Sequence, residues 1–238
     1  MPAGPLVYPE YLNDLKLLVC PSDSDGQNRY DGGRWNVDGK PALPVNPCRI
    51  DTLSYFYVGW LIDMKQHVAL PGVDINAAAM PVDASAVGTY IDPFTLDIFS
   101  NIFSSGKSIP ERIAAAVAAG MGAGATPERI VEDYVRPVID RDIPFKDYSA
   151  APSSDSRVLM RLKDGIERFL ITDINNPAGS AQAQSAIQVM SDEVNTDSQH
   201  FSHVPGGANV LYMDGHVSWI KYPGDGFVSK LWAVILGL

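Results

Sequence analysis

Apolar residues recur in short runs along this chain, and the clearest pattern lies near the C-terminus. Apolar and polar positions alternate over residues 208–213 and 216–222, as expected for two half-buried strands. Asp214-Gly215 stands between them, a pair that favours a two-residue type I′ turn. The pattern therefore predicts an antiparallel hairpin. Its buried face is predicted to carry Leu211, Met213, Val217 and Trp219.

Other apolar runs predict further strands and short helices. Residues 53–62 are aromatic and β-branched, which favours a largely buried strand, and Gly59 within them marks a bulge or a close contact. Residues 158–162 and 166–172 also have strand character. The segments 8–19 and 227–238 predict a short helical turn and a terminal helix.

The middle third of the chain has the signature of two helices. Ser108 and Thr126 each stand where an N-cap acceptor is needed, followed by proline and glutamate, ahead of residues 112–119 and 129–139. The glycine-rich residues 120–125 between these segments match neither spacing of a phosphate-binding loop. They are interpreted as a linker between two helices.

Composition and charge narrow the class of protein. The 238 residues include 18 Lys and Arg against 28 Asp and Glu, a net charge of −10, which argues against nucleic-acid and anionic-membrane binding. Hydrophobic residues make up 46% and charged residues 19%, a globular composition. No apolar stretch reaches the roughly 18 residues of a membrane span, and the N-terminus lacks a signal-peptide pattern. These features predict a soluble chain with a real core.

The two cysteines, Cys20 and Cys48, flank a loop-like segment rich in Gly, Pro, Asp and Asn. A disulfide between them is the preferred prediction, and two free buried thiols are the alternative. Two isolated cysteines are too few to form a zinc site by themselves.

Both ends of the chain resemble a known family. The residues concerned are 8–12, 19–23, 54–60 and, above all, His203-Val204-Pro205-Gly206-Gly207-Ala208-Asn209-Val210-Leu211-Tyr212-Met213-Asp214-Gly215-His216. They resemble bacterial prepilin-like proteins related to type II secretion pseudopilins, whose C-terminal signature is a His, nine residues and Asp-Gly. Here ten residues separate His203 from Asp214. The family's N-terminal apolar anchor helix would end just before this chain begins, and the resemblance does not extend over residues 69–150.

The resemblance implies an α+β fold, a small antiparallel sheet packed on a helix, with an inserted helical pair. It implies one domain over residues 1–238, with residues 69–150 as a variable, partly helical insertion. It further implies protein–protein contacts with other pseudopilin-like or secretion-assembly proteins, and a periplasmic or cell-surface location, which a disulfide would also fit. Related major pseudopilins bind Ca²⁺ in the loop that enters the last strands, so calcium is the expected cofactor.

Oxygen ligands are concentrated in the segment just before the predicted hairpin. Calcium takes ~6–8 oxygen ligands from carboxylates, amides and carbonyls. The predicted calcium ligands are Asp192, Asn195, Asp197 and Ser198, with Asp173 and Asn175 approaching from a neighbouring strand end. The alternative is a solvated polar loop with Asx turns. A second acidic segment, residues 23–31, echoes an EF-hand loop but lacks its glycine and glutamate positions, and is interpreted as a turn-rich loop.

No motif for nucleophilic catalysis is present, and the catalytic residues stay unassigned. His200, His203 and His216 lie near Asp214 in sequence, but an extended strand separates His203 from Asp214, so a structural role for His203 is preferred to metal ligation. The leading hypothesis is therefore a pseudopilin-like domain with a structural calcium site. The alternatives are a calcium-dependent hydrolase of small esters, lactones or phosphoesters on the same scaffold, and an envelope- or carbohydrate-binding module, which requires exposed aromatic residues.

Overall fold

The computed structural model describes residues 4–80, 88–93, 117–126, 129, 142–144, 157–163, 165–166, 183–204 and 206–237. Their main feature is an antiparallel sheet of four strands in the order β1-β4-β5-β6. The strands are β1 (Tyr55–Tyr57), β4 (Gln188–Asp192), β5 (Gly207–Tyr212) and β6 (Val217–Lys221). Together with several short helices this sheet confirms the predicted α+β class, with a small antiparallel sheet.

One face of the sheet is covered by the C-terminal helix α9 (Lys230–Leu236), which follows the short helix η9 (Gly226–Val228). Ser229 caps α9, because its hydroxyl accepts a hydrogen bond from the Trp232 amide. The five residues after Lys230 are buried, and they pack with Ala208 and Val210 of β5. Burying each large apolar side chain contributes ~1.5–3 kcal/mol, so this contact forms the main core. The predicted terminal helix is confirmed.

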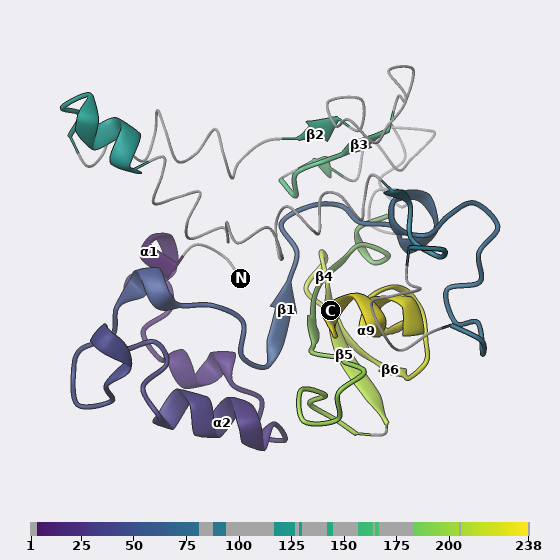
Figure 1. Cartoon of the computed structure of the whole chain (residues 1–238), viewed down its shortest axis with the longest axis horizontal. Helices are drawn as coiled ribbons and strands as arrows, with labels where there is room; N and C mark the ends of the chain where they lie inside the picture. Colours follow the sequence, from purple (N-terminus) through teal and green to yellow (C-terminus); the bar gives the residue numbers. More distant parts are fainter. Residues whose placement is uncertain are drawn as a thin grey trace.

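A second apolar cluster gathers the N-terminal segments. It contains Leu15, Val19, Trp35, Ile50 and Leu53 and is called here the N-terminal cluster. The surrounding helices are short: α1 (Gly4–Val7), η1 (Leu15–Leu18), α2 (Ser24–Asp31), η2 (Val37–Gly39) and η3 (Pro47–Arg49). In Figure 1 the N-terminal helices lie on one side of β1, and the rest of the sheet with α9 lies on the other.

Helix α2 corrects the expectation of a turn-rich loop over residues 23–31. Asp23 caps the helix by accepting a hydrogen bond from the Gly26 amide, and Asp25 forms an ion pair with Arg29 one turn later. The acidic residues that resembled a calcium loop therefore serve the helix, and this segment is not a loop.

The predicted hairpin is confirmed, but its turn and its buried face differ from expectation. Gly215 has φ of +90° and Asp214 does not have positive φ, while the Gly215 amide donates to the Tyr212 carbonyl. This is a three-residue loop with glycine in the left-handed position, not a type I′ turn. Val217 and Trp219 are exposed, because α9 covers the opposite face of the hairpin.

Only parts of the remaining predictions fall on described residues. The run at residues 53–62 forms β1 over three residues, and the guanidinium of Arg161 approaches the Gly59 carbonyl at 2.7 Å, the predicted close contact. The run at 158–162 forms β3 (Val158–Leu159), which pairs with β2 (Ile143–Pro144). A short helical turn, η4 (Met64–Val68), follows β1.

The predicted insertion and helical pair lie largely outside the described residues. Residues 117–119 are helical, as predicted for the end of the first helix, but the helix continues through residues 120–122, which were predicted to belong to the linker; most of 129–139 and of the strand at 166–172 is not described. Ala69, Ile75, Met80 and Ile91, at the start of the predicted insertion, are buried in the main core. The single domain over 1–238 with an insertion at 69–150 stays a prediction.

The predicted disulfide is not present, since Cys20 and Cys48 are both free. Cys20 is buried, and its sulfur contacts a histidine. Cys48 is exposed in η3, where its amide donates to the Asn46 side chain. The two thiols therefore lie in different surroundings, and only Cys20 faces the interior.

Candidate metal centre

The candidate site consists of Cys20, Asp192 and His203, which come from three separate segments. Cys20 lies between the N-terminal cluster and helix α2. Its neighbour Val19 is buried in that cluster, and the Cys20 carbonyl accepts a hydrogen bond from the Asp23 amide. Packing on one side and a turn on the other thus fix the thiol, which is 3% exposed.

Asp192 is the last residue of β4 and lies opposite Tyr55 of β1. Its carboxylate is 1% exposed, and Oδ2 accepts hydrogen bonds from both the backbone and the side-chain nitrogen of Asn209, at 2.6 and 2.9 Å. These two donors hold the carboxylate in one orientation, as outer partners commonly do for metal ligands.

His203 lies in the loop between β4 and β5. The His203 carbonyl accepts a hydrogen bond from the Gly206 amide, which closes a turn, and the ring packs edge-on against Trp219 at 5.3 Å between centroids. The side chain is 19% exposed. The backbone contact near Gly206 agrees with the structural role expected for His203, but its imidazole has a different partner.

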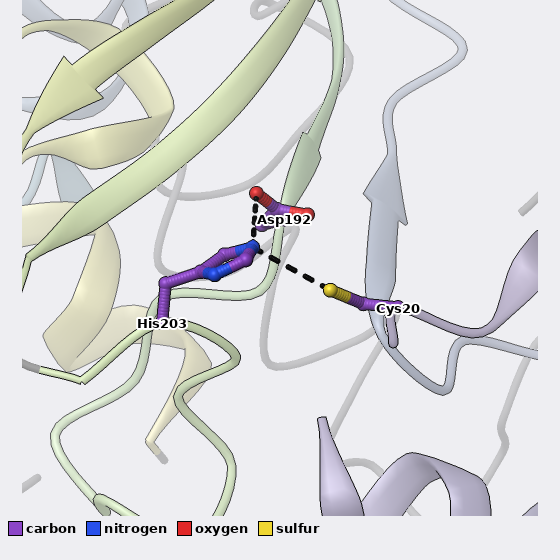
Figure 2. A group of neighbouring side chains, drawn as sticks. All are labelled: Cys20, Asp192 and His203. Carbon is purple, nitrogen blue, oxygen red and sulfur yellow. Dashed lines mark hydrogen bonds and ion pairs between the residues drawn. The ribbon is translucent and has the colours of Figure 1, made fainter. Parts of the chain in front are cut away.

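The three side chains converge on one point. His203 Nε2 lies 3.0 Å from Asp192 Oδ2 and 3.4 Å from Cys20 Sγ. The three ligand atoms all lie within 4.8 Å of one another. Figure 2 shows that the same ring nitrogen points toward both the carboxylate and the sulfur.

A single hydrogen on Nε2 of His203 cannot form full hydrogen bonds with both Asp192 and Cys20. If Nε2 carries a hydrogen, that hydrogen is directed at the Asp192 oxygen 3.0 Å away, and the sulfur receives at best a share of it. If Nε2 lacks a hydrogen, its lone pair faces a carboxylate oxygen. A cation at the centre would bond to sulfur, nitrogen and oxygen together, so the three side chains could hold a metal ion.

The spacing and the donor types fit a tetrahedral transition-metal ion such as zinc. Tetrahedral zinc with bonds of ~2.0 Å to nitrogen and oxygen and ~2.3 Å to sulfur keeps its ligand atoms roughly 3.3–3.5 Å apart. The separations of 3.0 and 3.4 Å found here are close to those values. Thiolate and imidazole are ligands of zinc and other transition metals, whereas calcium takes oxygen ligands. A thiolate and a carboxylate would also neutralise the two charges of Zn²⁺.

The same three residues do not form the usual nucleophile–histidine–acid relay. In such a relay the acid orients the imidazole through one ring nitrogen while the other nitrogen takes the proton of the nucleophile. Here Asp192 and Cys20 both contact Nε2 of His203. The geometry therefore favours a metal site over thiol catalysis.

Tyr55 borders the site from β1. Burial, together with the neighbouring Cys20 and Asp192, raises the pKa of the Tyr55 hydroxyl to about 12. The phenol therefore stays protonated at neutral pH and adds no negative charge beside the two anionic donors.

The residues predicted to bind calcium do not come together as one group within the described part of the chain. Asp192 turns to His203 and Asn209. The Asn195 side chain accepts from the Asp197 amide and donates to the Leu236 carbonyl. Asp197 accepts from the Gln199 amide, and Ser198 is exposed. The segment thus has the Asx turns of the alternative interpretation, while Asp173 and Asn175 lie outside the described residues.

The other two C-terminal histidines have separate partners. His216 contacts Asp214 at 2.6 Å in the hairpin turn, and hydrogen bonds to His216 hold the pKa of Asp214 below its ordinary value. His200 lies 3.6 Å from Asp25 of helix α2. Among the residues that the structure describes, His203 alone of these histidines joins the candidate metal centre.

Sequence reasoning named Asp192 as a metal ligand, considered His203 and missed Cys20. Cys20 and His203 are 183 positions apart, and neither lies in a short motif with metal-ligand spacing. Only the resemblance at residues 19–23 and 203–216 singled out both regions.

No family model, no curated protein and no solved structure matches this chain. A search of the described residues also finds no helix with the length and apolar character needed to cross a membrane.

Proposed function

We propose that this protein binds a zinc ion through Cys20, Asp192 and His203, within a pseudopilin-like domain that acts by protein–protein contacts in a secretion or pilus-like assembly. The observation that carries the zinc proposal is the convergence of three buried or partly buried donors from distant segments within 4.8 Å. The pseudopilin-like part is supported by the C-terminal sequence signature and by the small antiparallel sheet. A periplasmic or cell-surface location follows from that resemblance alone, because the cysteines do not form a disulfide.

The proposed role of zinc is to tie the N-terminal cluster to the sheet. Cys20 belongs to the N-terminal side, whereas Asp192 and His203 belong to the sheet and its loop. Few described polar contacts join these parts. Ser54 contributes two, since its carbonyl accepts from the Glu193 amide at 2.8 Å and from the Ser202 hydroxyl at 3.3 Å. A bound metal couples directly to folding because the unfolded chain lacks the assembled site.

Zinc replaces calcium in this proposal because of the donor set. Calcium bound at Asp192 requires several further oxygen ligands, and the nearest titratable partners of Asp192 are a thiol and an imidazole. Binding of calcium at the segment 192–198 is a separate hypothesis, which a calcium titration in the presence of saturating zinc examines.

Cobalt spectroscopy tests the proposal directly. Purified metal-free protein titrated with Co²⁺ is expected to bind one equivalent, with a thiolate-to-cobalt charge-transfer band and the visible bands of four-coordinate cobalt. Zinc is expected to displace the cobalt. Cys20→Ser removes the sulfur ligand, so the charge-transfer band disappears, while Cys48→Ser removes the exposed thiol and leaves the spectrum unchanged.

Two further pairs of variants provide matched controls. Asp192→Asn and His203→Gln are expected to weaken zinc binding at least tenfold by calorimetry, because such ligands contribute strongly to affinity. Asp197→Asn and His200→Gln change the same residue types nearby and should leave affinity within about twofold. A charge-transfer band that survives Cys20→Ser and vanishes in Cys48→Ser would overturn the assignment.

A zinc-dependent hydrolase of small esters, lactones or phosphoesters is the second candidate. The number of ligands favours it. Within the described residues the group consists of Cys20, Asp192 and His203, and catalytic zinc sites commonly use three protein ligands and a water. Zinc-loaded protein is expected to hydrolyse chromogenic esters, Asp192→Asn to lose the activity and Asp197→Asn to keep it. Turnover no faster than that of free zinc removes this candidate.

A further inference from the structure

A pocket of about 590 Å³ opens beside the candidate metal centre. Its walls come from the start of α2, from the loop around residues 198–206 and from β6. Its lining includes Ser22, Asp23, Ser24, His203, Gly206 and Trp219. His203 is common to the pocket and the metal centre, whereas Cys20 and Asp192 do not line the pocket.

Trp219 presents a fixed aromatic surface at this pocket. Its side chain is 52% exposed, although tryptophan is a costly residue to leave in water. The ring is nevertheless held on two sides, edge-on by His203 and by the backbone of Gly206, where an added Cβ would lie 3.3 Å from the ring. A large exposed aromatic surface beside a pocket with polar groups is typical of a ligand-binding site.

Asp23 offers an unused acceptor at the same place. The residue is only 8% exposed, and its Oδ1 accepts the Gly26 amide at 2.9 Å. No described residue donates a hydrogen bond to its Oδ2. Because Asp23 lines the pocket, its carboxylate can accept hydrogen bonds from a ligand that presents hydroxyl or amide hydrogens. The hydroxyls of Ser22 and Ser24 can both donate and accept beside it.

The charge of the pocket disfavours acidic ligands. Among the described residues, no lysine or arginine lines the pocket, while Asp23 does, and Asp25 lies in the first turn of α2, two residues further on. A phosphate or carboxylate would therefore meet a carboxylate without a compensating cation.

We propose that this pocket binds a neutral saccharide, whose apolar ring face stacks on Trp219 and whose hydroxyls donate to Asp23 and exchange hydrogen bonds with the serine hydroxyls. The site is distinct from the zinc centre and does not require it, because the residues that make these contacts are not metal ligands. The ligand chemistry combines an apolar ring face with several hydroxyl donors, which matches a lining that combines Trp219 and Phe201 with the hydroxyls of several serines.

The test uses a defined panel of sugars. Glucose, galactose, N-acetylglucosamine and their β-1,4-linked disaccharides are titrated into the full chain, with calorimetry and tryptophan fluorescence as readouts. At least one neutral sugar is expected to bind with a millimolar or lower Kd, and to protect tryptophan fluorescence from quenching. Glucuronate and inorganic phosphate are expected to bind at least tenfold more weakly than that sugar.

Variants locate the binding. Trp219→Ala and Asp23→Asn are expected to weaken binding at least tenfold, and asparagine at position 23 can still cap α2. Val217→Ala is the control, because Val217 is 59% exposed on the same strand face but does not line the pocket. The proposal is overturned if no sugar binds at 50 mM, if Trp219→Ala binds like Val217→Ala, or if glucuronate or phosphate binds best. Sugar binding to Cys20→Ser is measured in parallel, because this variant lacks a proposed zinc ligand. If it binds the sugar without zinc, the saccharide proposal stands independently of the zinc proposal.

Discussion

Asp192 also has a structural role that does not depend on a metal. Its buried carboxylate accepts two hydrogen bonds from Asn209 and faces His203, so it fixes the β4–β5 connection even in metal-free protein. Hydrogen bonds to a charged group contribute about 1.5–3 kcal/mol. Metal-free Asp192→Ala is therefore expected to lose roughly that much stability in urea denaturation.

Asp192→Asn is expected to lose less, since asparagine keeps an acceptor for Asn209. Asp197→Ala is the exposed control and should cost under about 1 kcal/mol. If Asp192→Ala and Asp197→Ala unfold at the same urea concentration, the carboxylate of Asp192 does not have the stabilising role described here.

His67 is expected to make the stability of the protein depend on pH in the mildly acidic range. Burial lowers the pKa of His67 below 6.5, Arg157 lowers it further, and Asp63 partly opposes both. Its Nδ1 accepts the Asp63 amide at 3.0 Å, which requires the neutral ring. As pH falls through about 6.5, the unfolded chain takes up a proton that the folded chain resists, so this contribution to stability is present above that pH and is lost below it.

His67→Asn is the matched variant, because its side-chain oxygen can accept the same amide without titrating. Wild-type protein is expected to lose more stability than His67→Asn between pH 7.5 and 5, measured by urea denaturation of both proteins free of metal. Parallel pH profiles of the two proteins would contradict the assignment of this effect to His67.

The candidate metal centre was only partly predictable at the residue scale. The concentration of acidic residues before the hairpin pointed to Asp192, which also belongs to the candidate metal centre. Cys20 has no such signal, because its partners are brought to it by tertiary packing and a lone cysteine in sequence favours no particular chemistry. The strand argument correctly separated His203 from Asp214, yet it gave no way to find Asp192 as the actual partner of His203.

At the scale of elements, helix α2 depends on a glycine that helix propensity disfavours. Gly26 is buried, and a Cβ there would lie 2.4 Å from Asp23 Oδ2 and 2.6 Å from Ser54 Oγ. Alanine normally stabilises a helix relative to glycine by up to about 1 kcal/mol. Here the overpacking reverses the sign, and Gly26→Ala is expected to destabilise the protein by about 1–3 kcal/mol.

Gly122 is the matched control in another helical segment, residues 117–122. Nothing lies within 4 Å of the position that its Cβ would occupy. Gly122→Ala is therefore expected to be neutral or to stabilise by up to about 1 kcal/mol in the same denaturation experiment. A stabilising Gly26→Ala would show that the Asp23 cap and Ser54 can move aside.

Elements with strong local signals were the predictable ones. The hairpin was marked by alternation and Asp-Gly, and α9 by a continuous apolar run. Helix α2 was missed because Asp, Asn and Gly favour turns locally, whereas the Asp23 cap and the Asp25–Arg29 pair stabilise a helix. The exposure of Val217 and Trp219 depends on which face α9 covers, and alternation within one strand does not contain that information.

At the scale of the whole molecule, the N-terminal helices lie on one side of β1 and the rest of the sheet with α9 lies on the other (Figure 1), and these two parts hold the N-terminal cluster and the main core. The α+β class with a small antiparallel sheet could be predicted because it follows from element types alone. The separation of the N-terminal cluster from the main core could not, because it depends on Trp35, Ile50 and Leu53 packing with Leu15 and Val19 instead of with α9. Cys20 and Ser54 lie where the two clusters meet, which places the candidate zinc site at their junction.

A metal ion at this junction should protect the N-terminal side of the molecule selectively. Ligand present at 100 times its Kd stabilises the state that binds it by about 2.7 kcal/mol. Chelation is therefore expected to speed hydrogen exchange of amides in α2 (Ser24–Asp31), which follows Cys20, more than in α9 (Lys230–Leu236), which is buried in the other cluster and holds no ligand. Mass spectrometry measures this difference as the exchange rates of the amides in α2 and α9, with zinc and with chelator.

The cysteine variants are the controls. In Cys20→Ser the exchange rates should be the same with zinc and with chelator, whereas Cys48→Ser should respond to zinc as the wild type does. Equal protection of α2 and α9 by zinc would mean that the two clusters open together, and the ion would then stabilise one cooperative unit instead of joining two.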